Sequence, residues 1–403
     1  MSTENLMIVQ GGGPTAVFNA SLASIIAESL RQPRVGKIFG ALSGMKGLSA
    51  ADADIVDLSH LTASNLLSLR NTPGASLGSS RFKPTDEDLE RSVEHLRRLD
   101  VRHLVFMGGN GTMRGAELFR QFCRKLNFDL QIIGVPKTID NDILATDRCP
   151  GFASAARFVA QSTLDLSMDI RSLPQPVSIF ETLGRDVGWL AASSTLAKLD
   201  PDDAPHLVYV PETAFSRDKF LADLDAVVSR IGWAVVVVSE GIAYADGTAV
   251  FEQKIGSLNK SVHRPLIGGV AQYLSGVVAE DLGIRCRSEK PGLIGRSCMA
   301  QVSEQDLADA ELVGREGVRA LLAGETDKMV SLRGLGDQVA EGVRLVPLSE
   351  AAGSHRAIPE DWLSNDALAV TDAFRDYVRP LLGDLSYYAP PLKIAPRFET
   401  QSP

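Results

Sequence analysis

The sequence lacks any run approaching the roughly 20 apolar residues that span a bilayer, so we expect no membrane partner. It also lacks a basic excess, because its formal net charge is −9 at pH 7. General nucleic-acid binders carry a surplus of Lys and Arg, and we therefore expect no nucleic-acid partner. The N-terminal stretch MSTENLMIVQGGG has no basic lead and no cleavage-type site, which favours a cytoplasmic protein.

Cysteine is scarce as well. The four cysteines form no CxxC pair and have no histidine at zinc-finger spacing: Cys123, Cys149, Cys286 and Cys298. Free or buried thiols in a reducing compartment are therefore favoured over a zinc site or a disulfide framework. The six histidines show no metal-ligand grouping, and we assign none of them to chemistry: His60, His95, His103, His206, His263 and His355.

What the chain does have is length and a full complement of apolar residues. Its 403 residues fit two or three domains, and 44% of them are hydrophobic against 23% charged. A cleft between domains is then the expected place for a site. A chain with this acidic balance could bind an anion only where its Arg and Lys are gathered locally.

Short β-branched runs alternate with segments of helical apolar spacing. The predicted strands are 6–10, 103–107, 131–135, 177–181, 207–211 and 234–239, and the clearest predicted helices are 16–31 and 112–126. This alternation predicts an α/β fold with open, mainly parallel sheets, whose ligands bind at the carboxyl ends of strands. Turn residues suggest a boundary near Cys149-Pro150-Gly151, and residues 386–403 are expected to be a wrapped or loose extension.

Two glycine-rich turns follow predicted strands and precede predicted helices, one at 11–15 (GGGPT) and one at 108–112 (GGNGT). Glycine lets the backbone approach an anion, and a helix N-terminus offers free N–H groups. Neither turn has the dinucleotide or the Walker pattern, and either alone could be a tight turn without a ligand. Together they suggest a polyphosphate across adjacent helix N-termini.

The segment 135–142 (VPKTIDND) also follows a predicted strand. Phosphoryl transfer to an alcohol needs a carboxylate to accept the hydroxyl proton and cations to offset the charge on the transferring group. Asp140 suits the base, Asp142 a metal or hydroxyl partner, and Lys137 the phosphate. Read alone, such an Asp/Asn-rich segment is more often an ordinary turn.

GGNGT followed by PKTIDND resembles the phosphofructokinase family. GGGPTAVFNA, LGSSRF, ETLGRDVGWLA and VVVSEG follow the family's order, and the resemblance covers roughly residues 5–345. CPGFASAARF and the stretch 203–206 (DAPH) are most similar to the pyrophosphate-dependent branch of about the same length. The resemblance implies two Rossmann-like, three-layer domains with the active site between them. Residues 1–149 plus about 296–347 would bind the phosphoryl donor, and 150–295 plus about 348–403 the sugar phosphate.

The resemblance also implies a role for individual residues in transfer from ATP or pyrophosphate to fructose 6-phosphate. The catalytic set would be Asp140 as base with Lys137, Arg81 and Gly13. The sugar phosphate would be held by Thr138, Asp142, Leu183, Gly184, Arg185, Glu240, Arg287 and Arg296. The donor would lie on Gly12, Gly13, Gly109, Gly111 and Thr112, and Mg2+ on Asn110 and Asp142. A homodimer or homotetramer, with arginines crossing the interface, is implied as well.

Three positions depart from the family pattern. Asn110 stands where an acidic residue usually helps to hold Mg2+, which should weaken metal binding. Gly111 leaves room for the α-phosphate of ATP, whereas Lys137 is typical of pyrophosphate users; on steric grounds we lean to ATP. Leu293 replaces the usual histidine between the two sugar-phosphate arginines.

These departures keep other hypotheses open. Sedoheptulose 7-phosphate or another sugar phosphate could be the acceptor. A catalytically weakened homologue that senses sugar phosphates is a second hypothesis, although a binding module needs no proton acceptor at Asp140. A nicotinamide dehydrogenase is disfavoured, because the dinucleotide fingerprint is missing.

Overall fold

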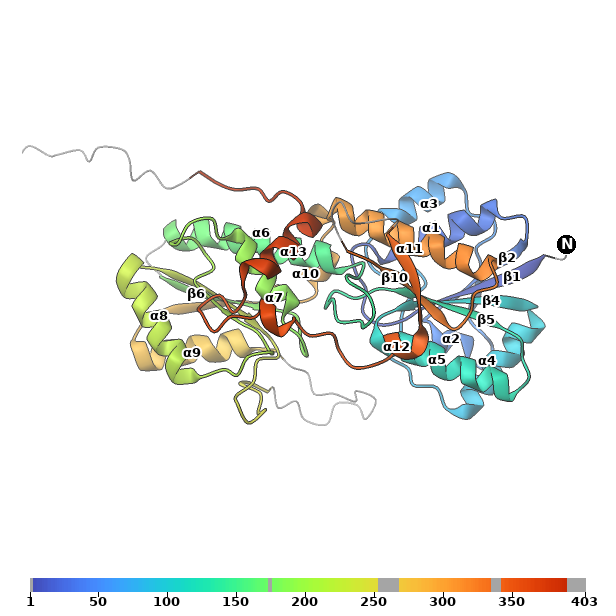
Figure 1. Cartoon of the computed structure of the whole chain (residues 1–403), viewed down its shortest axis with the longest axis horizontal. Coiled ribbons are helices and arrows are strands. Elements are labelled where there is room, and N and C mark those ends of the chain that lie inside the picture. Colours follow the sequence, from blue (N-terminus) through green and yellow to red (C-terminus); the bar gives the residue numbers. More distant parts are fainter. Residues whose placement is uncertain (1–2, 173–175, 253–267, 335–341, 390–403) are drawn as a thin grey trace, which may run out of the picture.

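The computed structural model describes residues 3–172, 176–252, 268–334 and 342–389, and it divides into two α/β domains (Figure 1). The larger sheet has the strand order β11-β10-β5-β4-β1-β2-β3. Its strands are β1 (Glu4–Gln10), β2 (Val35–Ala41), β3 (Ile55–Asp57), β4 (Val101–Gly108), β5 (Gln131–Pro136), β10 (Lys328–Leu332) and β11 (Val343–Pro347). The five central strands are parallel, and only the edge strands β3 and β11 pair antiparallel.

Helices cover both faces of this sheet, because successive strand residues point to opposite sides. In β1, Leu6 and Ile8 pack against α1 (Phe18–Arg31) and α11 (Glu304–Leu322), with α3 (Ala63–Arg70) alongside. Met7 and Val9 face the other layer, formed by α2 (Met45–Leu48), α4 (Asp86–Arg98), α5 (Asn110–Lys125) and α12 (Leu348–Ala351). A parallel strand buried on both faces explains the nearly continuous apolar runs in the sequence.

The smaller sheet is wholly parallel in the order β7-β8-β6-β9. Its strands are β6 (Val177–Thr182), β7 (Leu207–Tyr209), β8 (Ala234–Ser239) and β9 (Cys286–Glu289). One face packs against α6 (Phe152–Ser172), α7 (Trp189–Ser193) and α13 (Asp372–Leu382), and the other against α8 (Arg217–Ile231) and α9 (Val270–Leu282). The short helix α10 (Ile294–Ser297) contacts α6. The α/β fold expected from the sequence is confirmed.

Predicted element bounds differ from the observed ones mainly at the ends. The helix expected from residue 16 begins at Phe18, because Ala16 and Val17 are buried in the turn that precedes it. The strand expected over 207–211 ends at Tyr209. No helix in the described ranges has the length and apolarity that crossing a membrane requires.

Within the described residues the chain crosses between the domains three times: before α6, between β9 and α11, and after α12. At the start of α6, the buried carboxylate of Asp306 on α11 accepts backbone N–H groups from Gly151 (2.8 Å) and Ser154 (3.0 Å). After α12 the chain crosses back toward the smaller sheet (Figure 1). Because α12 packs on α5 of the larger domain, we place this return after Ala352 rather than at about residue 348.

Candidate active site

The two glycine turns lie next to each other at the carboxyl edge of the larger sheet. Strands β1 and β4 are adjacent and parallel, with Gln10 level with Met107, so the residues that follow them share one edge. A Cβ at Gly108 would lie 2.2 Å from the hydroxyl oxygen of Thr112, and one at Gly11 would lie 2.5 Å from it. A side chain at either position would collide with Thr112, which explains the two glycines here.

Lys137 closes one side of these turns. Its ammonium donates to the carbonyl oxygen of Gly13 at 2.6 Å and lies 4.7 Å from the ring centroid of Phe18. The side chain is buried, and this burial, helped by the positive charge of Arg296, lowers the pKa of Lys137 to about 8. At neutral pH, Lys137 therefore places a positive charge beside the glycine turn at 11–15, the predicted donor turn.

Asp140 follows β5 and lies close enough to Lys137 of the larger domain and Glu240 of the smaller domain for both charges to act on it. Burial, followed by the neighbouring charges of Asp142 and Glu240, raises the pKa of Asp140 to about 7, and Lys137 opposes this rise. Lys137 follows a strand of the larger sheet, whereas Glu240 follows β8 of the smaller sheet. A carboxylate whose pKa lies near neutrality is suited to accept a hydroxyl proton.

Asp142 is held by three side chains. Thr138 donates its hydroxyl to one carboxylate oxygen at 3.1 Å, and the Asn110 amide donates to the other at 2.8 Å. His355 Nδ1 lies 2.6 Å from that same second oxygen. Its Nε2 lies 3.4 Å from a carboxylate oxygen of Asp186, which is on the loop after β6. One histidine therefore joins loops of both domains.

The oxygen of the Asn110 side chain is buried and has no hydrogen-bond partner. With the Asp142 carboxylate it makes a small set of hard oxygen ligands, which suits Mg2+ because this ion takes its other ligands from phosphates and water. In the described part of the chain, no group of three or more His, Cys, Asp or Glu side chains forms a complete metal site by itself.

Four of the predicted sugar-binding residues lie on loops that follow β6 and β8 of the smaller sheet: Leu183, Gly184, Arg185 and Glu240. Gly184 has a φ of 128°, a backbone conformation that favours glycine, and its carbonyl accepts the Ser239 hydroxyl. Burial raises the pKa of Glu240 to about 6, against the lowering effects of Lys290 and Arg185. Leu183 and Arg296 line a small apolar cavity of about 20 Å3 beneath these loops.

Arg296 lies closer to the donor turn than its predicted role requires. A Cβ at Gly13 would lie 2.9 Å from its guanidinium. Burial lowers the pKa of Arg296, the charge of Arg81 lowers it further, and Asp140 raises it. The structure thus brings Arg81, Arg296 and Lys137 to the region between the donor turn and Asp140, which supplies the local cations that the acidic chain needs.

Arg287 is not brought to this group within a single chain. It is exposed on the edge strand β9, level with Ser178 near the start of β6. Thr182, at the end of β6, is four residues further along, which corresponds to about 13 Å of strand. Its predicted contact with the sugar phosphate remains a prediction.

The family model for phosphofructokinase matches residues 5–321. This chain belongs to the phosphofructokinase family. It is 36% identical to the pyrophosphate–fructose 6-phosphate 1-phosphotransferase of Xanthomonas campestris, over 95% of this chain and 92% of that protein. It is 32% identical to the sulfofructose kinase of Alkalicoccus urumqiensis, over 88% and 91%. Its fold matches the pyrophosphate-dependent phosphofructokinase of Marinobacter aquaeolei with a TM-score of 0.84 and 31% identity, covering 95% and 93% of the two chains.

Within this phosphofructokinase fold, sequence reasoning missed two contacts. His355 had been assigned to no chemistry, yet it touches Asp142 and Asp186. It is 213 residues from Asp142 in sequence, so spacing gave no signal. Lys290 likewise lies 2.8 Å from the buried carboxylate of Glu181, which caps the start of α9. For Glu181 the sequence did offer a signal, because a charged residue near the end of an apolar strand needs a partner when it is buried.

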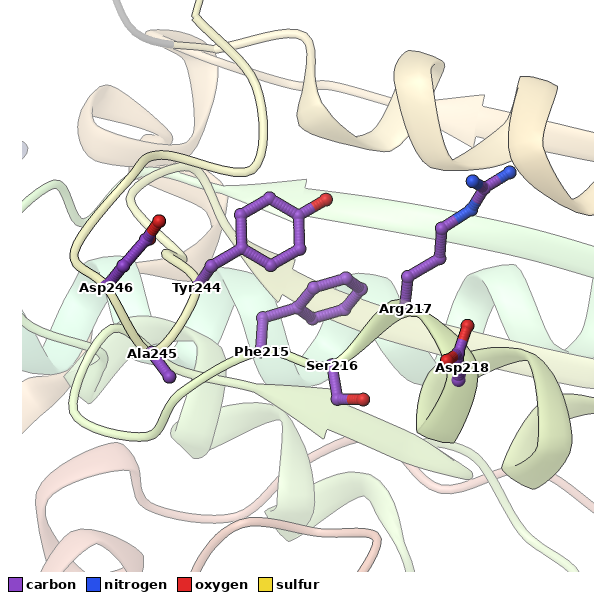
Figure 2. A pocket seen from close by; sticks show the side chains of 7 residues that line it. All are labelled: Phe215, Ser216, Arg217, Asp218, Tyr244, Ala245 and Asp246. Carbon is purple, nitrogen blue, oxygen red and sulfur yellow. The ribbon is translucent and has the colours of Figure 1, made fainter.

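A larger hollow lies elsewhere on the smaller domain. An open depression of about 460 Å3 is formed by the start of α8 and the loop after β8, and Figure 2 shows the seven residues that line it. None of them is among the predicted site residues. Its size therefore does not mark it as the active site, because the predicted site residues described above lie elsewhere.

Proposed function

We propose that this chain transfers the terminal phosphoryl group of ATP or pyrophosphate to the 1-hydroxyl of fructose 6-phosphate, forming fructose 1,6-bisphosphate. The observation that carries the proposal is the position of Asp140. Its carboxyl group, with a pKa of about 7, lies between Lys137 at the donor turn and Glu240 at the sugar loops. A proton acceptor between a phosphate-binding turn and a polyol-binding loop suits phosphoryl transfer to a hydroxyl.

In the proposed reaction, Asp140 takes the proton from the 1-hydroxyl of the sugar. The hydroxyl oxygen then forms a bond to the terminal phosphorus, and the bond from that phosphorus to the bridging oxygen breaks. The electron pair leaves with ADP, or with phosphate when pyrophosphate is the donor. Lys137, Arg296 and Arg81 would offset the charge on the transferring group, which is where most catalysis of this class originates.

Mg2+ is the proposed cofactor, held by the donor phosphates together with Asp142 and the side-chain oxygen of Asn110. When bound, it would neutralise charge on the donor phosphates. Asn110 contributes no negative charge, so we propose weaker metal binding than an acidic residue would give.

The donor is proposed to be ATP at least as readily as pyrophosphate. A Cβ built at Gly111 meets no heavy atom within 4 Å, so the space beside the second turn is open. Lys137 and the name of the Xanthomonas relative favour pyrophosphate instead. Lys137 does not by itself exclude a nucleotide, however, because its positive charge attracts the phosphates of either donor.

Leu293 supports a second acceptor. It stands where the family has a histidine, its side chain is 61% exposed, and it offers no hydrogen bond to the anionic end of the sugar. A sugar whose terminal group carries less charge than phosphate would lose less by this change. A sulfonated fructose, the class named for the Alkalicoccus relative, and sedoheptulose 7-phosphate are the alternatives to test.

The deciding experiment is a matrix of donors and acceptors with the purified chain and Mg2+. ATP and pyrophosphate are each combined with fructose 6-phosphate, sedoheptulose 7-phosphate and 6-deoxy-6-sulfofructose, and the phosphorylated product is identified by mass spectrometry. We expect the highest kcat/KM for fructose 6-phosphate. Tight binding of a sugar phosphate without turnover with either donor would support a sensor instead. Absence of both binding and turnover would contradict the proposal.

A further inference from the structure

His355 belongs to the segment that returns from the larger domain to the smaller one. Its ring contacts a carboxylate on each side: Nδ1 is 2.6 Å from Asp142, and Nε2 is 3.4 Å from Asp186. Asp142 follows β5 of the larger sheet, and Asp186 follows β6 of the smaller sheet. The side chain is 38% exposed.

The backbone that follows His355 is held in place by the next residue, Arg356. Its N–H donates to the carbonyl oxygen of Asp142 at 2.8 Å, and its carbonyl accepts the indole N–H of Trp189 at 3.0 Å. Its guanidinium donates to the carbonyl oxygen of Asn141 at 3.0 Å and lies 4.6 Å from the Trp189 ring. The return segment is therefore bound both to the segment 135–142, through Asn141 and Asp142, and to α7, through Trp189. These contacts give the neighbouring His355 a defined position.

The 2.6 Å contact between His355 Nδ1 and Asp142 also shows which atom is the hydrogen-bond donor. A carboxylate only accepts, so His355 Nδ1 carries the proton that it shares with Asp142, and Nε2 acts as a donor toward Asp186 when the ring carries a proton on that nitrogen as well. The Asn110 amide donates to the same carboxylate oxygen, and Thr138 donates to the other one. These three contacts hold the carboxylate in its observed orientation, and His355 is the partner that comes from outside the glycine turn at 108–112 and the segment 135–142.

We propose that His355 is a positioning residue of the active site, which sets the orientation of Asp142 beside the base and links it to the sugar-binding loop at Asp186. Its catalytic consequence rests on the function proposed above. Loss of the link should lower kcat and raise the KM for the sugar phosphate more than the KM for the donor. Some change in the KM for the donor is expected as well, because Asn110 of the second glycine turn donates to the same oxygen of Asp142 at 2.8 Å.

Two near-isosteres separate the two contacts. Asparagine places its amide nitrogen near the position of Nδ1 and can keep the bond to Asp142, whereas glutamine reaches toward the position of Nε2 and Asp186. We expect His355→Ala to lower kcat by about 10- to 100-fold, the scale of a small misplacement of reacting groups. His355→Asn should restore most of kcat but not the sugar KM, and His355→Gln should restore the sugar KM but not kcat.

Hydrogen exchange gives a readout that does not need turnover. Amides of residues 138–147 should exchange faster in His355→Ala than in wild type, and His355→Asn should restore the wild-type rate. The matched control is His60→Ala, because His60 is an exposed histidine outside the site. Equal exchange and equal kinetics in the alanine and asparagine variants would overturn the inference. A wild type inactive with every donor would contradict the proposed function, and the exchange rates would still decide the role of His355.

Discussion

The ammonium of Lys137 lies 2.6 Å from the carbonyl oxygen of Gly13, across 124 positions of sequence. The contact forms because β1, β4 and β5 are neighbouring parallel strands whose carboxyl ends share one edge. A buried cation is thereby fixed against the turn that would receive the donor. Its burial also has a cost, because removing a charge from water lowers the pKa of Lys137 to about 8.

This lowered pKa predicts a pH dependence of donor use. Lys137 is charged below about pH 8 and neutral above it, so kcat/KM for the donor should fall as the pH rises through this value. The profile of kcat/KM reports the free enzyme, in which no bound phosphate raises the pKa. Measurements of kcat/KM for the donor from pH 6.5 to 9.5 at fixed free Mg2+ would test this. Lys137→Met should have low activity without the alkaline fall, and a wild-type profile flat across pH 8 would contradict the role.

Replacement of the base gives the second prediction. Asp140→Asn keeps the size of the side chain but removes the proton acceptor, so turnover should fall by about 10² to 10⁴-fold. The dissociation constant of the sugar phosphate, measured by calorimetry, should change little. A variant with near wild-type turnover would show that another group accepts the proton.

Donor choice gives the third prediction. Gly111→Asp would place a carboxylate in the open space beside the donor phosphates. Like charges in a partly dry cleft repel, and the larger donor also needs that space. The ratio of kcat/KM for ATP to that for pyrophosphate should therefore fall by at least about tenfold, which corresponds to about 1.4 kcal/mol.

The matched control is Gly115→Asp, one turn further along α5, where a Cβ also meets nothing within 4 Å. It introduces the same charge on the same helix and should leave the donor ratio near its wild-type value. A wild type that uses pyrophosphate alone would show that Gly111 does not control the donor.

Stability gives the fourth prediction. Arg148 and Asp309 form a two-bond ion pair at 2.6 and 2.8 Å, with both side chains 5% exposed. Asp309→Ala leaves a buried guanidinium without its counter-ion and should destabilise the larger domain by about 3–5 kcal/mol. Arg148→Met combined with Asp309→Leu should cost less, because no buried charge remains. Urea denaturation followed by circular dichroism would measure both.

The control for this pair is Asp223→Ala. Asp223 pairs with Lys219 at the surface, where the lysine side chain is 56% exposed, and its loss should cost less than about 1 kcal/mol. An equal loss in the free energy of unfolding for Asp309→Ala and Asp223→Ala would contradict the larger contribution predicted for the buried pair.

The sequence by itself determined the α/β class, the two glycine turns and the loop with Asp140. These features are readable from short stretches of sequence, because a buried parallel strand needs a continuous apolar run and a tight turn between a strand and a helix favours glycine. Their position at the carboxyl ends of strands also follows from chain order, since each turn comes directly after its strand.

The tertiary structure alone decided which distant side chains meet. Nothing in the spacing of His355 links it to Asp142 and Asp186, because their contacts depend on where the chain crosses between two separately folded sheets. The same holds for the position of Arg296 beside Gly13 and for the exposed place of Arg287 on an edge strand. Periodicity reports which face of an element is buried, whereas contacts between domains depend on how whole elements pack.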